Sequence, residues 1–217
     1  MNAYRMLVVV PLLALSACIS LPFGKSDNTP PPAMYTLRNS SAGLTSVATE
    51  ASGRIVVVVP SPEVPPAFDT DRIAIRFEDG RIDYYADAQW SARLDELLQD
   101  VFIESAQRKF SGAVVGRPGF VPDANYRLAV KLNDFGPVYR GSPDMAPRLT
   151  AGLSLTIIEL PQDTVVAQFS VSKTAVASEN RLGPITSELK GVLNSAIDEA
   201  LEKAAPYITE PRTIVTR

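Results

Sequence analysis

Three stretches in the second half of the chain alternate between apolar and polar residues, and this pattern limits the fold more than any other feature does. They span residues 126–133, 149–157 and 165–172. In each stretch, apolar side chains fill every second position, and most residues between them are Arg, Lys, Asn, Gln, Ser or Thr. Successive side chains of a strand point to opposite faces of a sheet. The alternation therefore predicts three strands of an antiparallel sheet, with one face packed against the core and the other exposed to solvent.

Two stretches with helical periodicity predict the cover for this sheet. The first begins at Asp87, which we interpret as an N-cap, and runs to about Phe110. The second begins at Gly183-Pro184 and ends near Tyr207-Ile208. Two amphipathic helices suffice to cover one face of a sheet. We therefore expect an α+β fold, in which a mostly antiparallel β-sheet carries two amphipathic helices packed on one face, in the order strands, helix, strands, helix.

The first half of the chain predicts shorter strands. Residues 33–37 are predicted as a first strand, and the β-branched run 54–59 is typical of a strand that is buried on both faces. Residues 72–77 alternate strictly between polar and apolar side chains. Residues 81–85 follow as a second strand-like stretch, and Asp79-Gly80 lies between the two. Because Asp-Gly supplies the positive φ angles of a tight turn, these two stretches predict a β-hairpin.

The N-terminus has the pattern of an exported lipoprotein. A basic start with Arg5 is followed by the apolar run 6–14 and by Leu15-Ser16-Ala17-Cys18. This is the layout of a secretory signal peptide, and the run is shorter than the roughly 20 apolar residues of a membrane-spanning helix. Leu-Ser-Ala-Cys is similar to a bacterial lipobox, in which the cysteine is acylated and becomes the first mature residue. The alternative is a plain signal peptide, which would leave Cys18 as a free thiol.

These observations divide the chain into four parts. Residues 1–17 are predicted as a lipoprotein signal peptide. Residues 18–33 are the acylated cysteine and a tether that contains a proline triplet, which favours an extended backbone. Residues 34–209 are predicted as a single α+β domain, and residues 210–217 as a C-terminal tail.

The side-chain inventory argues against an enzyme. The chain has no histidine and one cysteine, so the commonest general base and metal ligand is missing. Ser187 and Lys190 match the S-x-x-K pattern of serine acylases, but the partner motifs S-D-N and K-T-G are missing. We therefore expect no catalytic residue and no cofactor, and we keep a hydrolase that uses Ser187 as the third alternative.

The acidic residues and the net charge exclude two further classes of function. Several aspartates lie close together in sequence without matching the pattern of a calcium loop, so we expect no metal site. They are Asp69, Asp71, Asp79, Asp83 and Asp87. The formal net charge is −3, and a mildly acidic chain without a run of Lys or Arg gives no electrostatic reason to bind nucleic acid.

Trp90, the only tryptophan, follows closely after Tyr84-Tyr85. Large aromatic side chains bury about 150–250 Å² each, so a place in the core or in an interface is the first interpretation. Contact with lipid is the alternative. Arg72, Tyr84, Tyr85 and Trp90 are our candidate contacts with a partner or a lipid.

A family resemblance rests on this same region. Asp69-Thr70-Asp71-Arg72-Ile73-Ala74-Ile75-Arg76, then Tyr84-Tyr85-Ala86-Asp87-Ala88-Gln89-Trp90, then Leu94 and Leu97-Leu98 resemble the ABC-type transport auxiliary lipoprotein family. The resemblance covers roughly residues 34–208. It implies a periplasm-facing lipoprotein without catalysis, which docks to or stabilises an ABC transporter that has a substrate-binding MCE-type subunit. Such systems move phospholipids or related lipids between the inner and outer membranes of Gram-negative bacteria.

The resemblance also implies partners and a location. The partners would be the membrane, through acyl chains on Cys18, and the MCE-type subunit. A homo-oligomer, such as a collar around a tube, would also fit. Ile19 stands at the second mature position, where the usual sorting rule keeps proteins with Asp at the inner membrane, so we expect the outer membrane. The alternative function is a lipid-binding carrier, whose sheet and helices would open to hold an acyl chain.

Overall fold

The computed structural model describes residues 31–38, 54–141 and 144–208. These residues belong to one compact unit, which spans Pro31–Arg217. The signal peptide, Cys18, Ile19 and the tail 210–217 lie outside the described residues, so what we expect of them stays a prediction. The same holds for most of the tether, of which only residues 31–33 are described.

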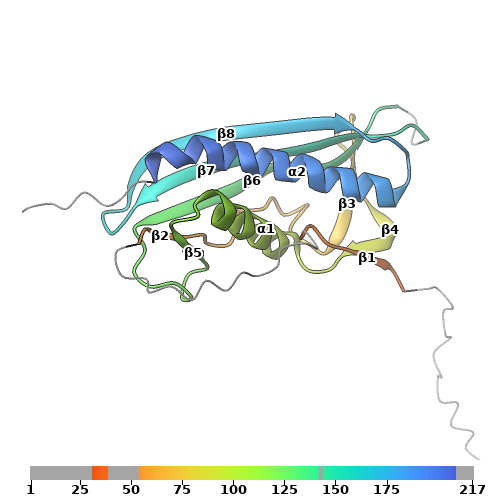
Figure 1. Cartoon of the computed structure of the whole chain (residues 1–217). Helices are drawn as coiled ribbons and strands as arrows, with labels where there is room; N and C mark the ends of the chain where they lie inside the picture. Colours follow the sequence, from red (N-terminus) through yellow and green to blue (C-terminus); the bar gives the residue numbers. More distant parts are fainter. Residues whose placement is uncertain (1–30, 39–53, 142–143, 209–217) are drawn as a thin grey trace, which may run out of the picture. The chain divides into compact units, whose positions relative to one another are not determined.

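The described residues form eight strands and two α-helices, and their fold is α+β (Figure 1). A 3₁₀ turn, Ala205–Tyr207, follows the second helix. In chain order the elements are β1 (Ala33–Tyr35), β2 (Val56–Val58), β3 (Arg72–Phe77), β4 (Ile82–Trp90), α1 (Leu94–Lys109), β5 (Val114–Gly116), β6 (Tyr126–Tyr139), β7 (Arg148–Glu159), β8 (Thr164–Val176) and α2 (Leu182–Ala204).

The sheet is mixed, so our prediction of a mostly antiparallel sheet is wrong. Of the seven strand pairings among the described residues, the four between β1 and β4, β2 and β5, β2 and β6, and β3 and β6 are parallel. Only the β3–β4, β6–β7 and β7–β8 pairs are antiparallel. Hairpin signals in a sequence reveal antiparallel neighbours, whereas parallel pairs form between strands that long connections separate. The helices also do not alternate one by one with strands, because four strands precede α1 and four more precede α2.

Strand β6 joins the two halves of the sheet. On one edge it pairs with β7 along almost its whole length, from Tyr126 to Val138. On its other edge β2 pairs with the start of β6, and β3 pairs with its end at Tyr139. A parallel bridge between Glu63 and Lys131 lies between these two pairings. Every strand of the sheet is thus connected to β6 directly or through one or two neighbours.

Strand β4 extends through the region that we predicted as the start of a helix. We predicted Asp87 as an N-cap and Trp90 in the first helical turn, and both predictions are wrong. Residues Ala88, Gln89 and Trp90 pair in parallel with Ala33, Met34 and Tyr35 of β1, which holds this segment extended. Helix α1 begins at Leu94, and the residue before it, Arg93, makes no side-chain cap. Tertiary pairing outweighs the local helical pattern here.

The two helices lie on the same side of the sheet, where α2 runs along β7 and β8 and α1 lies beside α2 (Figure 1). All the residues of the predicted apolar stripe of α2 are buried, each at most 8% exposed. They are Ile185, Leu189, Val192, Leu193, Ala196, Ile197, Ala200, Leu201 and Ala204. They form one core cluster with the inward residues of β6 and β7.

Two β-bulges change which side chains face this core. In β8 the register shifts at Val166, so that Val165 pairs with Ile158 while Ala167 pairs with Ile157. Val165 therefore points away from the core and is 57% exposed, contrary to the strict alternation that we predicted for this strand. In β6 a second shift at Asn133 places Phe135 in the core at 3% exposed.

Glu199 of α2 connects this helix to β8. Its carboxylate lies 2.5 Å from Nζ of Lys173 on β8 and 2.8 Å from Nζ of Lys203, one helical turn further on. The hydrogen bonds from Lys173 and Lys203 lower the pKa of Glu199 to about 2. Since this value lies below the ~4.3 of an unfolded glutamate, the interaction stabilises the fold above that pH, and the stabilisation is lost as the pH falls through about 2.

We expect Glu199→Gln to lower the free energy of unfolding by a small, constant amount between pH 5 and pH 8, because exposed ion pairs contribute little. The difference from the unchanged protein should shrink toward pH 2, where Glu199 becomes protonated. Urea unfolding followed by circular dichroism at several pH values measures the difference in stability and its decrease toward pH 2. Glu202→Gln is the matched control, because Glu202 is exposed on the same helix and takes no part in this ion pair. Identical pH profiles for the two variants would contradict the assignment.

Candidate functional site

The four candidate contact residues all lie on the β3–β4 hairpin. Gly80, with φ of +87°, forms the turn that the sequence predicted, and the N–H of Arg81 donates a hydrogen bond to Oδ1 of Asp79 at 3.0 Å. The hairpin is therefore confirmed. It is continuous with the rest of the sheet, because β3 also pairs with β6.

Arg72 and Tyr84 form an accessible pair on one face of the hairpin. The guanidinium carbon of Arg72 lies 3.9 Å from the centroid of the Tyr84 ring, which is a cation–π contact. The hydroxyl of Tyr84 donates a hydrogen bond to the carbonyl oxygen of Ala67 at 3.0 Å. This bond fixes the ring, and the ring in turn positions the exposed Arg72. The result is a cation held in one orientation at the surface.

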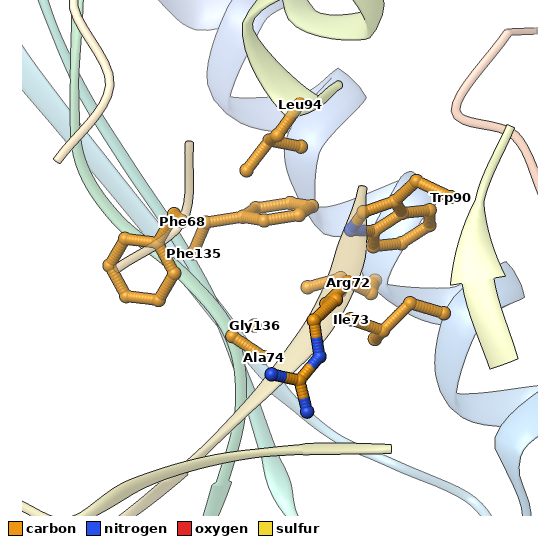
Figure 2. Close-up of a pocket in the computed structure, with 9 residues that line it drawn as sticks. Phe68, Arg72, Ile73, Ala74, Trp90, Leu94, Phe135 and Gly136 are labelled. Atoms are coloured by element: carbon orange, nitrogen blue, oxygen red, sulfur yellow. The ribbon is translucent and has the colours of Figure 1, made fainter. Parts of the chain in front are cut away.

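Trp90 lies in the core, where its side chain is 3% exposed. Its ring centroid is 6.1 Å from that of Phe135. A small cavity of about 10 Å³ lies beside these rings (Figure 2). Its lining consists of Phe68, Arg72, Ile73, Ala74, Trp90, Leu94, Phe135, Gly136 and Leu189. Figure 2 shows the guanidinium of Arg72 pointing away from the rings of Phe68 and Trp90.

This cavity is too small for an acyl chain. Its volume is about that of a single water-sized probe. The backbone is also closely packed there, because Gly136 has φ of +118° and a Cβ at that position would lie 3.2 Å from the carbonyl oxygen of Ala74. The surroundings of Trp90 therefore give a packed core next to an exposed cation, and they do not give a lipid pocket.

Tyr85 belongs to a separate hydrogen-bond chain. Its hydroxyl lies 2.9 Å from the hydroxyl of Tyr139, which donates to Oδ1 of Asn180 at 2.8 Å. Tyr85 is then the donor to Tyr139. Burial, with the hydrogen bond to Tyr139, raises the pKa of Tyr85 well above its ordinary value. Tyr85 therefore stays neutral at physiological pH and joins β4 to β6 and to the segment before α2. The structure thus brings Arg72, Tyr84 and Trp90 together and leaves Tyr85 in a different network.

The attachment of the N-terminal segment to the helices was not foreseen from the sequence. Leu37 is 0% exposed. Next to it, Nε of Arg38 donates a hydrogen bond to Oε1 of Glu104 on α1 at 2.9 Å, and Nζ of Lys190 on α2 donates to the carbonyl oxygen of Arg38. Residues 38–53 are rich in Ser, Thr, Ala and Gly and are therefore predicted as loop, and a single arginine gives no sign of a contact with the helices.

The remaining motifs have no catalytic or metal-binding arrangement. Ser187 is exposed on α2, and the ammonium group of Lys190 bonds the Arg38 carbonyl oxygen. Among the residues that the structure describes, no group of three or more Cys, Asp or Glu side chains could hold a metal ion. In the same residues, neither helix is long and apolar enough to cross a membrane.

Comparison with known proteins gives a family and a fold. A family model described as "ABC-type transport auxiliary lipoprotein component" matches residues 35–181, which includes the whole sheet from the end of β1 to β8. A crystal structure from Xanthomonas campestris is 20% identical with a TM-score of 0.60, and the match covers 79% of this chain and 90% of that one. A crystal structure of an uncharacterized protein is 12% identical with a TM-score of 0.63, covering 80% and 98%. At such identities these two likenesses show the fold alone. A search of curated proteins found no match.

Proposed function

Because the chain belongs to the family of ABC-type transport auxiliary lipoproteins, we propose that it is the docking or stabilising subunit of an ABC transporter with an MCE-type subunit. The transported cargo in this proposal is a phospholipid or a related lipid that moves between the inner and outer membranes. The observation that carries the proposal is the family match, which spans the hairpin with its candidate contacts and both halves of the sheet.

The geometry of the hairpin supports docking over carrying. The cavity beside Trp90, next to the candidate contacts, measures only about 10 Å³, so this part of the hairpin has no internal space for an acyl chain. In contrast, Arg72 is exposed and held by Tyr84, which suits a fixed contact with another protein. Arginine and tyrosine are both enriched among the residues that dominate binding at protein interfaces.

The proposed location is the periplasmic face of the outer membrane. Acyl chains on Cys18 would hold the protein there, and Ile19 lacks the acidic group that retains lipoproteins at the inner membrane. The attachment of Leu37 and Arg38 to the helices would fix the point at which the tether enters the domain. The lipid-anchored subunit would then stand at a limited distance from the membrane, where a transporter subunit that crosses the periplasm could reach it.

Site-specific crosslinking tests this function. A photo-reactive amino acid at Arg72 or at Tyr84 should capture the MCE-type subunit in intact cells, because both positions lie on the proposed contact surface. The same amino acid at Glu202, an exposed position on α2, is the matched control and should capture much less. Immunoblotting for the MCE-type subunit, or mass spectrometry of the adduct, gives the readout. If positions 72 and 84 give no more adduct than position 202 while the transporter is expressed, the docking surface is wrong.

A further inference from the structure

A groove separate from the cavity beside Trp90 lies where β6 and β8 end and β7 begins. Its volume is about 170 Å³. Val138, Arg148 and Val176 are paired across β6, β7 and β8, so their side chains share one face of the sheet. Leu149, the next residue of β7, is fully buried under the helices. Because neighbouring strand residues point to opposite faces, Arg148 and the two valines lie on the face away from the helices.

Arg148 supplies an uncompensated positive charge in this groove. Its Nε is buried and has no hydrogen-bond partner, and its guanidinium makes no ion pair with any residue that the structure describes. The Nε of Arg76 is also buried without a partner, but the rest of its guanidinium is bound. On the same face, Arg76 is paired with Asp134 and donates to the hydroxyl of Thr150 at 2.6 Å.

The second cation of the groove is already paired. Nε of Arg140 lies 2.8 Å from Oε1 of Glu78, and both of these side chains are more than half exposed. An anion that entered the groove would therefore meet one free guanidinium, that of Arg148, and one guanidinium that is shared with Glu78. A buried donor without a partner costs free energy, and an anionic ligand would remove this cost.

The walls of the groove beside Arg148 are apolar. Val138, Met145, Ala146 and Val176 complete its lining. Met145 is 64% exposed and Val176 is 71% exposed. Exposed apolar side chains that gather in one place mark a binding surface. Next to a free guanidinium, they favour a ligand that is charged at one end and apolar at the other.

We propose that this groove binds an anionic amphiphile, with a phosphate or carboxylate group on Arg148 and the adjoining methylene groups against Val138, Met145 and Val176. The guanidinium fork of arginine fits both kinds of anion. A groove of about 170 Å³ is smaller than the usual 300–1,000 Å³ of a small-molecule pocket, so it holds the headgroup and the first methylenes only. The source in the cell would be a membrane lipid, and this part alone rests on the proposed function.

Titration of the purified full chain with hexyl phosphate, by calorimetry in a non-ionic detergent, tests the site. Hexyl phosphate should bind, and inorganic phosphate should bind more weakly because it has no apolar part. Arg148→Gln should weaken the binding of hexyl phosphate by about tenfold or more, since a hydrogen bond to a charged group is lost. Val176→Ser, at an exposed position, should weaken the binding of hexyl phosphate several-fold and leave the binding of inorganic phosphate unchanged. Arg127→Gln is the matched control, because Arg127 is paired with Asp163 at the other end of β6. This substitution should leave the binding of hexyl phosphate unchanged.

Several results would overturn the proposal. It fails if hexyl phosphate does not bind, or if folded Arg148→Gln binds it as well as the control does. It also fails if inorganic phosphate and hexyl phosphate bind equally, because the site would then recognise only the anion. If Arg148→Gln changes the sedimentation coefficient while the binding of hexyl phosphate stays the same, the proposal also fails, and the groove is a contact between copies of this chain. Crosslinking at Arg72 is independent of all these outcomes, so the docking function and the amphiphile site can fail separately.

Discussion

A mature chain with Cys18→Ala, exported behind a signal peptide that is cleaved without a lipobox, is expected to appear in the soluble periplasmic fraction. The unchanged protein should remain in the washed membrane fraction. The reason is that several acyl chains hold a protein firmly on a bilayer, and Cys18 is the predicted site of these chains. Cell fractionation with immunoblotting, and mass spectrometry of the N-terminal peptide, measure the location and the acylation.

A second substitution serves as the control for this experiment. Ile19→Asp keeps Cys18, the predicted site of acylation, and should leave the protein in the membrane fraction. It should be found in the inner membrane, which a density gradient separates from the outer one. The soluble Cys18→Ala protein should keep the circular dichroism spectrum of a folded domain. If the Cys18→Ala protein stays on membranes after washing with salt and carbonate, the lipoprotein interpretation is wrong.

Trp90→Ala is expected to lower the free energy of unfolding by about 3–5 kcal/mol, the usual loss when a large aromatic side chain is removed from a core. Trp90 is 3% exposed and packs against Phe135. Its strand also holds β1, so the variant should loosen the N-terminal segment at Ala33–Tyr35. Urea unfolding followed by circular dichroism gives the first effect, and hydrogen exchange of Met34 and Tyr35 gives the second.

Phe120→Ala is the matched control for Trp90→Ala. Phe120 is also a large aromatic residue, but it is 86% exposed, and surface substitutions usually change stability by less than about 0.5 kcal/mol. The comparison also separates the two interpretations of Trp90. If Trp90→Ala costs no more stability than Phe120→Ala does and yet abolishes crosslinking from Arg72, then Trp90 acts in contact with a partner.

Local sequence signals were sufficient for the elements whose structure is decided locally. The three alternating stretches became β6, β7 and β8, the Asp79-Gly80 turn joined β3 to β4, and the apolar stripe from Ile185 to Ala204 became the buried face of α2. Each of these signals lies within one stretch of chain. Periodicity and turn chemistry are therefore enough to recognise them.

The errors and omissions arose where distant residues determine the structure. Trp90 is in a strand because Tyr35 pairs with it, and no pattern around Trp90 contains that partner. Val165 faces outward because of a bulge at Val166, which alternation does not show. The groove at Arg148 is formed by the ends of three strands and the loop between β6 and β7. Its residues have no common motif in the sequence.

The central position of β6 has a consequence for the order in which this protein folds after export. The chain emerges with its N-terminus first. Val57 of β2 cannot pair until Tyr126 has emerged, and Arg76 of β3 cannot pair with β6 until Val138 has emerged. Contacts between such distant residues form slowly, because a long loop must close first. Until residues 126–139 arrive, the apolar β2 run and one edge of the hairpin have no β6 neighbour, and such edges favour aggregation. We therefore expect the newly exported chain to be most prone to aggregation before its sixth strand has arrived.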